Sequence, residues 1–216
     1  MMSYCTITSG QTLRKLYQSG WGLFLTPLAL KSNRKAFMWA SSQEPRMRYA
    51  IDNGAWGAFV NETQWNAQEF IDILEKHGEE ADFAVVPDIV EGGSASLELS
   101  VTWLPTVLAH SPLALIPVQD GMTVDGVGPF LSDRVGVFVG GSTEFKESTI
   151  RMWSNLTRKT SSWCHVGRVN SVRRINLCTT AGVDSIDGTS VCRFSCTLPK
   201  LDAARRQMSF MEVLGE

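Results

Sequence analysis

The sequence predicts a compact α/β fold in one domain, the (β/α)8 or TIM barrel, and three observations predict it. Eight short apolar runs are spaced along the chain, each run ends in Gly, Pro, Asp, Asn or Ser, and helical patterns lie between the runs. Runs that are apolar on both faces are typical of parallel strands buried on both sides. Eight units in 216 residues leave 27 residues per unit, which is near the lower size limit of this fold.

The expected strands share a β-rich, mostly apolar composition. They are Tyr4–Thr8, Gly22–Thr26, Tyr49–Asp52, Asp82–Pro87, Leu113–Val118, Val135–Val139, Trp163–Val166 and Val183–Ile186. A doubly wound open sheet would also alternate strands with helices, but it usually has five or six units, and the first turn lacks a G-x-G-x-x-G fingerprint. Without a repeat or a long linker, residues 1–216 are expected to form one domain.

The expected helices have recognisable ends. Asn66 predicts an N-cap with Glu69 as its reciprocal partner, and His77-Gly78 ends that helix. Ser171 precedes an apolar face of Val172, Ile175 and Cys178 that ends at Gly182. Further helices are predicted over Ser94–His110, where Pro105 must kink or divide the helix, over Thr143–Leu156, and along the stripe Leu201, Ala204, Met208 and Met211.

The composition excludes several classes of protein. With 44% hydrophobic and 19% charged residues, the chain is neither disordered nor a disulfide scaffold, and its five scattered cysteines favour a reducing compartment. It has no membrane-length apolar run and no signal peptide, so we expect a cytoplasmic protein (host cytoplasm if phage-encoded) without a membrane partner. The net charge of −2 divides unevenly: 9 Lys/Arg against 16 Asp/Glu in residues 1–145, and 11 against 6 in residues 146–216. The basic third could face phosphates, or it could be ordinary solvated helix faces.

Polar residues follow the predicted strands at the end where TIM barrels build their active sites. They are Asp52-Asn53-Gly54, Pro87-Asp88, Gln119-Asp120-Gly121, Gly140-Gly141-Ser142, His165-Val166-Gly167-Arg168 and Asp187-Gly188-Thr189-Ser190. Asp52, Asp88 and Asp187 would therefore converge on one mouth. Each residue also has a structural explanation, because Asp-Asn-Gly often forms a turn, Pro-Asp often caps a helix, and paired glycines can merely turn the chain.

This set of residues argues against several chemistries. A Schiff-base aldolase needs a lysine at a strand end. The nearest candidate, Lys146, lies within a predicted helix, which argues against this chemistry. The three histidines are far apart, and Cys192 and Cys196 lack a second pair, so no metal site and no cofactor are expected. Several carboxylates beside a glutamine and a glycine pair suit chemistry at a glycosidic carbon, with one acid as nucleophile and another exchanging a proton.

From about Ala50 to Ser190, the chain resembles the tRNA-guanine transglycosylases, and more closely the DNA-guanine transglycosylases of phages and bacteria that insert 7-deazaguanines. The matching segments are Ile51-Asp52-Asn53-Gly54-Ala55-Trp56, Val86-Pro87-Asp88, Pro117-Val118-Gln119-Asp120-Gly121, Val139-Gly140-Gly141 and Gly182-Val183-Asp184-Ser185-Ile186-Asp187. Each segment is weak alone, but five in the right order make the resemblance fairly specific. Two departures are Asn53 in place of the usual Ser and Asp120 in place of a common Gly.

The resemblance implies exchange of guanine in DNA for a preQ0-like 7-deazaguanine, with retention of configuration. It makes Asp187 the nucleophile and Asp52 the general acid/base, while Asp88, Gln119, Gly140 and Gly141 bind the base. The family's zinc motif and its accompanying extra length are missing, which favours DNA over tRNA as substrate. Candidates for contacts with nucleic-acid phosphates are His165, Arg168, Arg173, Arg174 and Arg193. The sequence leaves open a nucleoside or glycoside hydrolase that uses the same acids, and a non-catalytic barrel that binds nucleic acid or protein.

Overall fold

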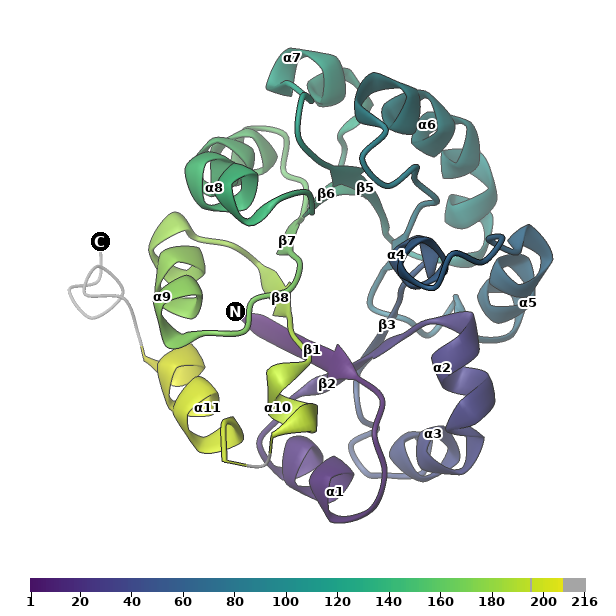
Figure 1. Cartoon of the computed structure of the whole chain (residues 1–216), viewed down its shortest axis with the longest axis vertical. Coiled ribbons are helices and arrows are strands. Elements are labelled where there is room, and N and C mark those ends of the chain that lie inside the picture. Colours follow the sequence, from purple (N-terminus) through teal and green to yellow (C-terminus); the bar gives the residue numbers. More distant parts are fainter. Residues whose placement is uncertain (195, 208–216) are drawn as a thin grey trace.

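In the computed structural model, which describes residues 1–194 and 196–207, eight parallel strands form a closed barrel surrounded by helices (Figure 1). Each strand pairs with the next one along the chain, and β8 pairs with β1. The predicted (β/α)8 barrel is therefore confirmed. The strands are β1 (Met2–Thr6), β2 (Gly22–Leu25), β3 (Tyr49–Ile51), β4 (Ala84–Val85), β5 (Ala114–Val118), β6 (Val135–Val139), β7 (Cys164–Val166) and β8 (Ser185–Asp187).

Helices fill most of the connections between strands. They are α1 (Gly10–Gln18), α2 (Pro27–Ser32), α3 (Arg34–Ser41), α4 (Ala55–Val60), α5 (Ala67–His77), α6 (Gly93–His110), α7 (Val124–Val127), the 3-10 turn η1 (Gly128–Phe130), α8 (Thr143–Lys159), α9 (Val172–Ala181), α10 (Ser190–Arg193) and α11 (Leu198–Arg206). Short helices α4 and α10 directly follow β3 and β8, so they lie beside the strand ends that carry the predicted acids.

All eight predicted strands are present, although their ends differ by a few residues. β1 begins and ends two residues earlier than predicted, because Met2 pairs with Ser185 and Tyr4 pairs with Asp187 of β8. β4 has only two residues, since Pro87 has no N–H to extend the ladder. This shortening leaves Asp88 on a loop beyond the strand rather than on it.

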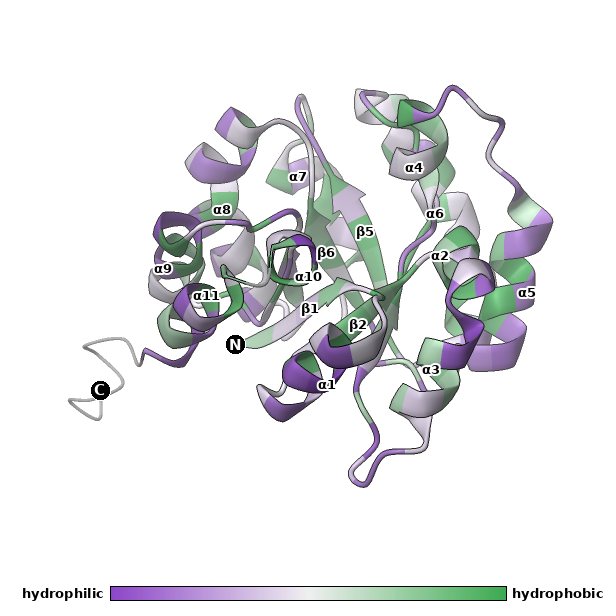
Figure 2. Cartoon of the chain, turned by 60° about the horizontal axis from the view of Figure 1, so that its bottom comes forward, coloured by the Kyte–Doolittle hydropathy of each residue, from purple (hydrophilic) through white to green (hydrophobic). Residues whose placement is uncertain are grey.

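The hydrophobic core has two layers that follow the alternation of side chains along each strand. Outward-facing residues pack against the helices, while an inner layer that includes Tyr4, Phe24, Phe83 and Leu115 fills the barrel. Figure 2 shows the strands mainly in green and the outer faces of helices such as α1 and α5 in purple. Because these side chains fill the middle of the barrel, its interior is a packed core and not a channel.

Most of the predicted helix ends are confirmed, with corrections that have a physical cause. The Asn66 side chain accepts the N–H groups of Gln68 and Glu69, but the Glu69 carboxylate turns to Lys31 at 2.9 Å rather than back to the cap. α6 runs unbroken past Pro105, whose exposed position on the helix leaves the freed carbonyl open to water.

Further corrections concern α9 and α11. Ser171 caps α9 and Gly182 ends it at φ +71°, as predicted, but Val172 is exposed and does not belong to the buried face. In α11, Leu201 and Ala204 are buried, whereas Met208 and Met211 of the predicted stripe lie outside the described residues. No residue ranges were predicted for helices α1 to α4. The Thr26 side chain nevertheless caps α2, where it accepts the Ala29 N–H at 3.0 Å.

Candidate active site

A pocket of about 570 Å³ opens at the carboxyl ends of the strands. A pocket of this size suits a small organic ligand, and TIM barrels carry their chemistry at this end. The structure places most of the sequence-predicted site residues in its wall: Asp52, Asp88, Gln119, Gly140, Gly141, Arg168 and Asp187. The three aspartates thus meet at one mouth although 135 positions separate the first of them from the last in the numbering.

Asp187, at the end of β8, is held by donors from β7 and the loop after it. Its Oδ1 atom lies 3.0 Å from Nε2 of His165, and the backbone N–H of Arg168 lies 3.3 Å from both carboxylate oxygens. The residue is only 8% exposed but lines the pocket. Gly167 is required here, because a Cβ at this position would lie 2.6 Å from the Phe138 ring and 3.4 Å from Oδ1 of Asp187. The arrangement presents an oriented carboxylate to a ligand.

Asp52 follows β3 and faces a different environment. Its Oδ1 accepts the backbone N–H of Gly54 at 3.1 Å, in a turn where Gly54 has φ +79°. Burial raises the pKa of Asp52 to about 7, against the lowering effect of the Gly54 hydrogen bond, and the charges of Asp187 and Asp88 raise it further. A carboxyl group with this pKa can both give and take a proton near neutral pH.

Asp88 is oriented by Asn53, which follows the same strand as Asp52 and was not among the predicted site residues. Nδ2 of Asn53 donates to the Val86 carbonyl at 2.7 Å and to Oδ1 of Asp88 at 2.9 Å, while its Oδ1 accepts the Ala55 N–H. Burial raises the pKa of Asp88, and the Asn53 hydrogen bond partly offsets that rise. Asn53 therefore joins the β3 and β4 loops and orients the second acid of the pocket.

The glutamine and glycine segments lie opposite these acids. Nε2 of Gln119 donates to the Ile89 carbonyl at 2.9 Å, which leaves its second N–H and its Oε1 for a ligand. Gly140 was expected to offer its backbone to the base, but its N–H is donated to Val118 within the sheet at 2.8 Å. The N–H of Gly141, where φ is +70°, is then the donor that this pair can offer.

Asp120 has a structural task that explains its presence. Its carboxylate accepts the N–H and the Oγ–H of Ser142, both at 2.7 Å, at the start of α8. The Ser142 N–H bond holds the pKa of Asp120 below its usual range. A Cβ on Gly141 would lie 2.5 Å from the same carboxylate, so this close contact needs glycine.

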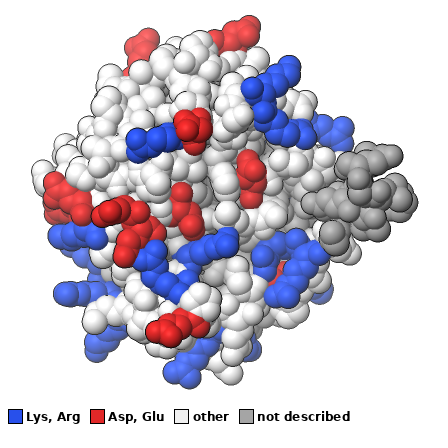
Figure 3. Space-filling view, turned by 180° about the vertical axis from the view of Figure 1, so that it is seen from behind, with Lys and Arg blue, Asp and Glu red and all other residues white. Residues whose placement is uncertain are grey.

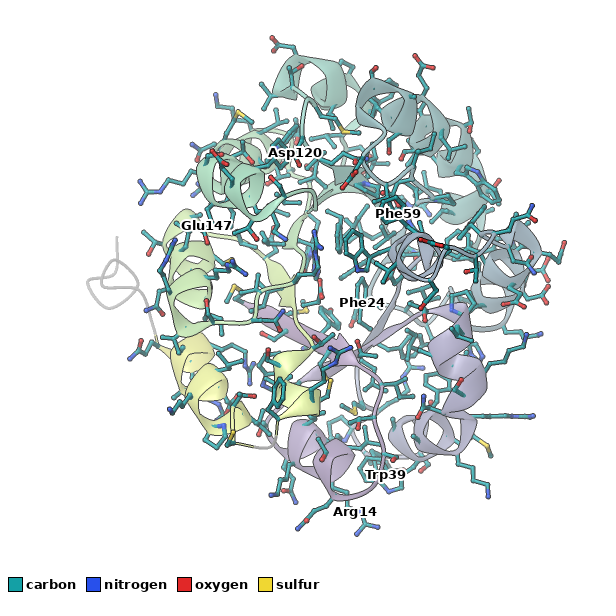
Figure 4. All side chains as sticks on the ribbon, viewed as in Figure 1. Arg14, Phe24, Trp39, Phe59, Asp120 and Glu147 are labelled. Carbon is teal, nitrogen blue, oxygen red and sulfur yellow. The ribbon has the colours of Figure 1, made fainter. Side chains whose placement is uncertain are left out.

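Arg168 and Trp56 meet across the mouth from opposite walls, since β7 and β3 are four strands apart in an eight-stranded barrel. The Arg168 guanidinium donates to the Gly141 carbonyl at 2.5 Å and lies 4.3 Å from the centre of the Trp56 ring. Trp56 also stacks on Phe59 of α4, and Figure 4 shows Phe59 on this helix, with Phe24 pointing into the middle of the barrel. Trp56 was not predicted as a pocket residue, and its place directly after Asp52-Asn53-Gly54-Ala55 is the one signal that could have indicated it.

The prediction that His165 contacts phosphate is wrong. The side chain is fully buried inside the barrel, where solvent and substrate do not reach it, and it contacts Asp187 and Ser185 instead. Ser185 was not predicted as a site residue, although its position two residues before Asp187 places both side chains on the same face of β8.

Of the predicted phosphate contacts, Arg168 lines the pocket, whereas Arg173, Arg174 and Arg193 lie outside its wall. Arg173 and Arg174 at the start of α9 both pair with Glu147 of α8, the Arg174 pair at 3.0 Å. Arg193 is exposed on α10, directly after β8. Ion pairs also join Asp202 to Arg205 and Arg206, so four of the eleven Lys and Arg residues in 146–216 are paired with nearby acids. Figure 3, which views the molecule from behind the view of Figure 1, shows Lys and Arg interspersed with Asp and Glu on that face.

The described part of the chain has neither a metal-binding cluster nor a helix that could cross a membrane. Within residues 1–194 and 196–207, no three His, Cys, Asp or Glu side chains are grouped closely enough to hold a metal ion. In the same part of the chain, no helix has both the length and the apolar character that a membrane crossing requires.

Comparison with solved structures reveals similar folds at low sequence identity. A protein from Coccidioides immitis described as a fructose-1,6-biphosphate aldolase matches with a TM-score of 0.59 and 8% identity, over 94% of this chain and 83% of the other. A tryptophan synthase from M. tuberculosis matches with a TM-score of 0.54 and 13% identity, over 94% and 89%. At such identities the likeness establishes the barrel fold alone. No protein-family model and no curated protein match the sequence.

Proposed function

We propose that this protein is an enzyme, a base-exchange glycosyltransferase that replaces guanine in DNA with a 7-deazaguanine base. The observation that carries the proposal is the grouping of three aspartates with different surroundings in one pocket. Asp187 is held by N–H donors, Asp52 has a pKa of about 7, and Asp88 is oriented by an amide. A nucleophile, a proton carrier and a base-binding acid are the three groups that this reaction needs.

The proposed reaction has two displacement steps at the same carbon. In the first, Asp187 attacks C1′ of the nucleotide, an ester bond forms, and the bond from C1′ to N9 breaks with its electron pair going to guanine. Asp52 supplies the proton that guanine takes as it leaves. In the second, the incoming base loses a proton to Asp52 and attacks C1′, and the ester bond breaks to release the Asp187 carboxylate. Two inversions give net retention.

The pocket offers groups that fit the edge of a guanine-type base. The free oxygen of Asp88 would accept hydrogen bonds from N1–H and the 2-amino group. The second N–H of Gln119 and the N–H of Gly141 would donate to O6 and lie near the substituent at position 7. Trp56 and Phe138 add aromatic surface to the same pocket. Arg168 would contact the substrate phosphate once its bond to Gly141 is exchanged.

DNA is favoured as substrate because the chain resembles the guanine transglycosylases but lacks their cysteine-and-histidine zinc motif. A nucleotide within a duplex must leave the base stack to enter this pocket, at a cost of a few kcal/mol. Single-stranded DNA avoids most of this cost, so we expect faster exchange on single strands than on duplexes.

Exchange of labelled guanine tests the proposal before the natural 7-deazaguanine is known. The protein is incubated with radiolabelled free guanine and single-stranded DNA, duplex DNA or tRNA, and the label in the polymer is counted. Label in DNA with the wild-type protein, and none with Asp187→Asn, is the expected result. Mass spectrometry of nucleosides after addition of 7-cyano-7-deazaguanine then identifies the inserted base.

The other outcomes identify the competing functions. Abasic sites and free guanine, formed without any added base, would indicate a hydrolase. Label in tRNA but not in DNA would overturn the choice of substrate. Binding of nucleic acid without release or uptake of guanine would indicate a non-catalytic barrel and reject the proposed function. Asp72→Asn, on the outer surface of α5, serves as the matched control for Asp187→Asn.

A further inference from the structure

We propose that Trp163, Ser185 and His165 form a buried relay that fixes His165 as its Nε2–H tautomer and thereby positions the Asp187 carboxylate. This inference deepens the proposed function, because it rests on Asp187 as the nucleophile. His165 acts through Asp187 and is a positioning residue, since its own side chain is fully buried and does not line the pocket.

Three hydrogen bonds in sequence carry the proposal. Nε1 of Trp163 lies 2.8 Å from Oγ of Ser185, the same Oγ lies 2.8 Å from Nδ1 of His165, and Nε2 of His165 lies 3.0 Å from Oδ1 of Asp187. His165 and Ser185 are both fully buried. The relay therefore runs through the interior of the barrel and ends on the carboxylate that faces the pocket.

The direction of each hydrogen bond follows from the chemistry of the groups. An indole N–H can only donate, so Ser185 Oγ accepts from Trp163 and has its own hydrogen free to donate. The Asp187 carboxylate only accepts, so Nε2 of His165 is the donor in that pair. A neutral imidazole has one N–H, so Nδ1 carries no proton and accepts the hydroxyl of Ser185.

Aromatic packing prevents the imidazole from turning away. Its ring stacks on Phe138, with 4.9 Å between the centres and 18° between the planes. Phe83 and Phe24 lie 5.1 Å and 5.7 Å from the ring centre. In this apolar cage the ring has Ser185 at one nitrogen and Asp187 at the other. A flipped or tilted ring would leave buried polar groups without partners.

The relay assigns different tasks to the two oxygens of Asp187. The Arg168 backbone N–H lies equally far from both oxygens, but His165 holds Oδ1 alone, so Oδ2 is the atom left to attack C1′. In the ester, Oδ1 becomes the carbonyl oxygen and keeps the N–H of His165. When the ester bond breaks, the same N–H stabilises the returning negative charge, and His165 neither gains nor loses a proton.

The first experiment measures the tautomer directly in the ligand-free protein. Long-range ¹H–¹⁵N correlation spectra of the histidine rings distinguish Nε2–H from Nδ1–H, and the chain has only three histidines to assign. We expect Nε2–H for His165 and a changed spectrum in Ser185→Ala. An Nδ1–H tautomer in the wild-type protein would overturn the relay. This measurement needs no turnover, so it separates the relay from the proposed function.

The second experiment compares kcat and KM for guanine exchange. His165→Phe keeps an aromatic ring among Phe24, Phe83 and Phe138 but removes the donor, and we expect kcat to fall roughly 10- to 100-fold with KM for guanine changed less than about twofold. His165→Gln, whose amide can accept from Ser185 and donate to Asp187, should recover most of that loss. The control is Tyr4→Phe, which removes a different, partly buried hydrogen bond, from Tyr4 to Asp82 at 3.0 Å, in the same aromatic layer.

Wild-type kcat in a folded His165→Phe protein would overturn the relay, and so would equal losses in His165→Phe and His165→Gln. If His165→Phe does not fold, the Ser185→Ala variant decides instead. A His165 tautomer and a kcat that are both the same in Ser185→Ala as in the wild type would overturn the relay. Absence of exchange by the wild-type protein would reject the proposed function, and the tautomer would still decide whether the relay exists.

Discussion

At the scale of single residues, the pocket gives chemically identical side chains different properties. The Asp187 carboxylate is oriented by the His165 ring nitrogen and the Arg168 backbone N–H. Asp52 is half-buried, and burial, with the charges of two nearby carboxyl groups, raises its pKa to about 7. In the proposed reaction the same amino acid therefore acts as an oriented nucleophile at one wall and as a proton carrier at another.

The raised pKa of Asp52 predicts a stability difference that depends on pH. The folded pKa of Asp52 is about 7 and its ordinary value is 3.8. The contribution of Asp52 to the free energy of unfolding therefore falls as pH rises between these values and is constant above them. Asp52→Asn lacks the charge and should be more stable than wild type at pH 8, by about 1–3 kcal/mol, with a smaller gain at pH 5. Urea denaturation of both proteins at the two pH values measures the difference.

Asp120 provides a control of opposite sign. Its pKa is held below the usual range by Ser142, so its charge stabilises the fold at high pH, and the contribution disappears as pH falls through the lowered pKa. Asp120→Asn should therefore be less stable than wild type at pH 8, where Asp52→Asn is more stable. Equal gains for Asp52→Asn at pH 5 and pH 8 would contradict the assignment of a raised pKa.

The sequence was sufficient to predict which acids share the pocket, because residues at the carboxyl ends of parallel strands must converge. It did not predict the partners that orient them. Asn53 interacts with Asp88, which is 35 positions away, and His165 with Asp187, which is 22 positions away. Such contacts depend on barrel closure and on which face of each strand looks inward. His165 was misassigned for this reason, since a strand-end pattern does not distinguish the last inward residue from the first exposed one.

At the scale of elements, the strands were predictable and several helices were not. Each strand is a continuous apolar run bounded by turn residues, whereas α2 to α4 have only six to eight residues each, too few for a repeated apolar face to show in the sequence. Two glycines illustrate the difference between the elements that contain them. Gly22 on β2 faces the barrel interior against Tyr4, while Gly57 on α4 has open space where a Cβ would be.

These two glycines predict opposite effects of the same substitution. A Cβ at Gly22 would lie 2.7 Å from the Tyr4 ring and 3.1 Å from the Arg48 carbonyl, so Gly22→Ala should destabilise the protein by about 1–3 kcal/mol. Gly57→Ala meets no atom within 4 Å and should stabilise α4 by about 0.5–1 kcal/mol. Thermal and urea denaturation of both variants measure the pair. A stable Gly22→Ala protein would show that the interior of the barrel can expand.

At the scale of the whole molecule, closure of the barrel brings the first half of the chain against the second across the pocket. Trp56 follows β3 and Arg168 follows β7, and their side chains meet over the mouth at 4.3 Å. Cation–π contacts of this kind contribute about 0.5–1 kcal/mol where they are exposed. The contact is therefore weak enough for a ligand to displace.

Binding of a base in the pocket should disturb the contact between Arg168 and Trp56. A purine that reaches the Gly141 N–H must share space with the Arg168 guanidinium, which is bonded to the Gly141 carbonyl and stacked on Trp56. Titration with guanine should therefore change the tryptophan fluorescence of the wild-type protein. Trp56→Phe should remove most of this change, although the chain has seven tryptophans. Trp39→Phe, on α3 beside Tyr17 and outside the pocket wall, is the matched control and should retain the change. A full fluorescence response in Trp56→Phe would show that the base does not disturb the contact between the two halves of the chain.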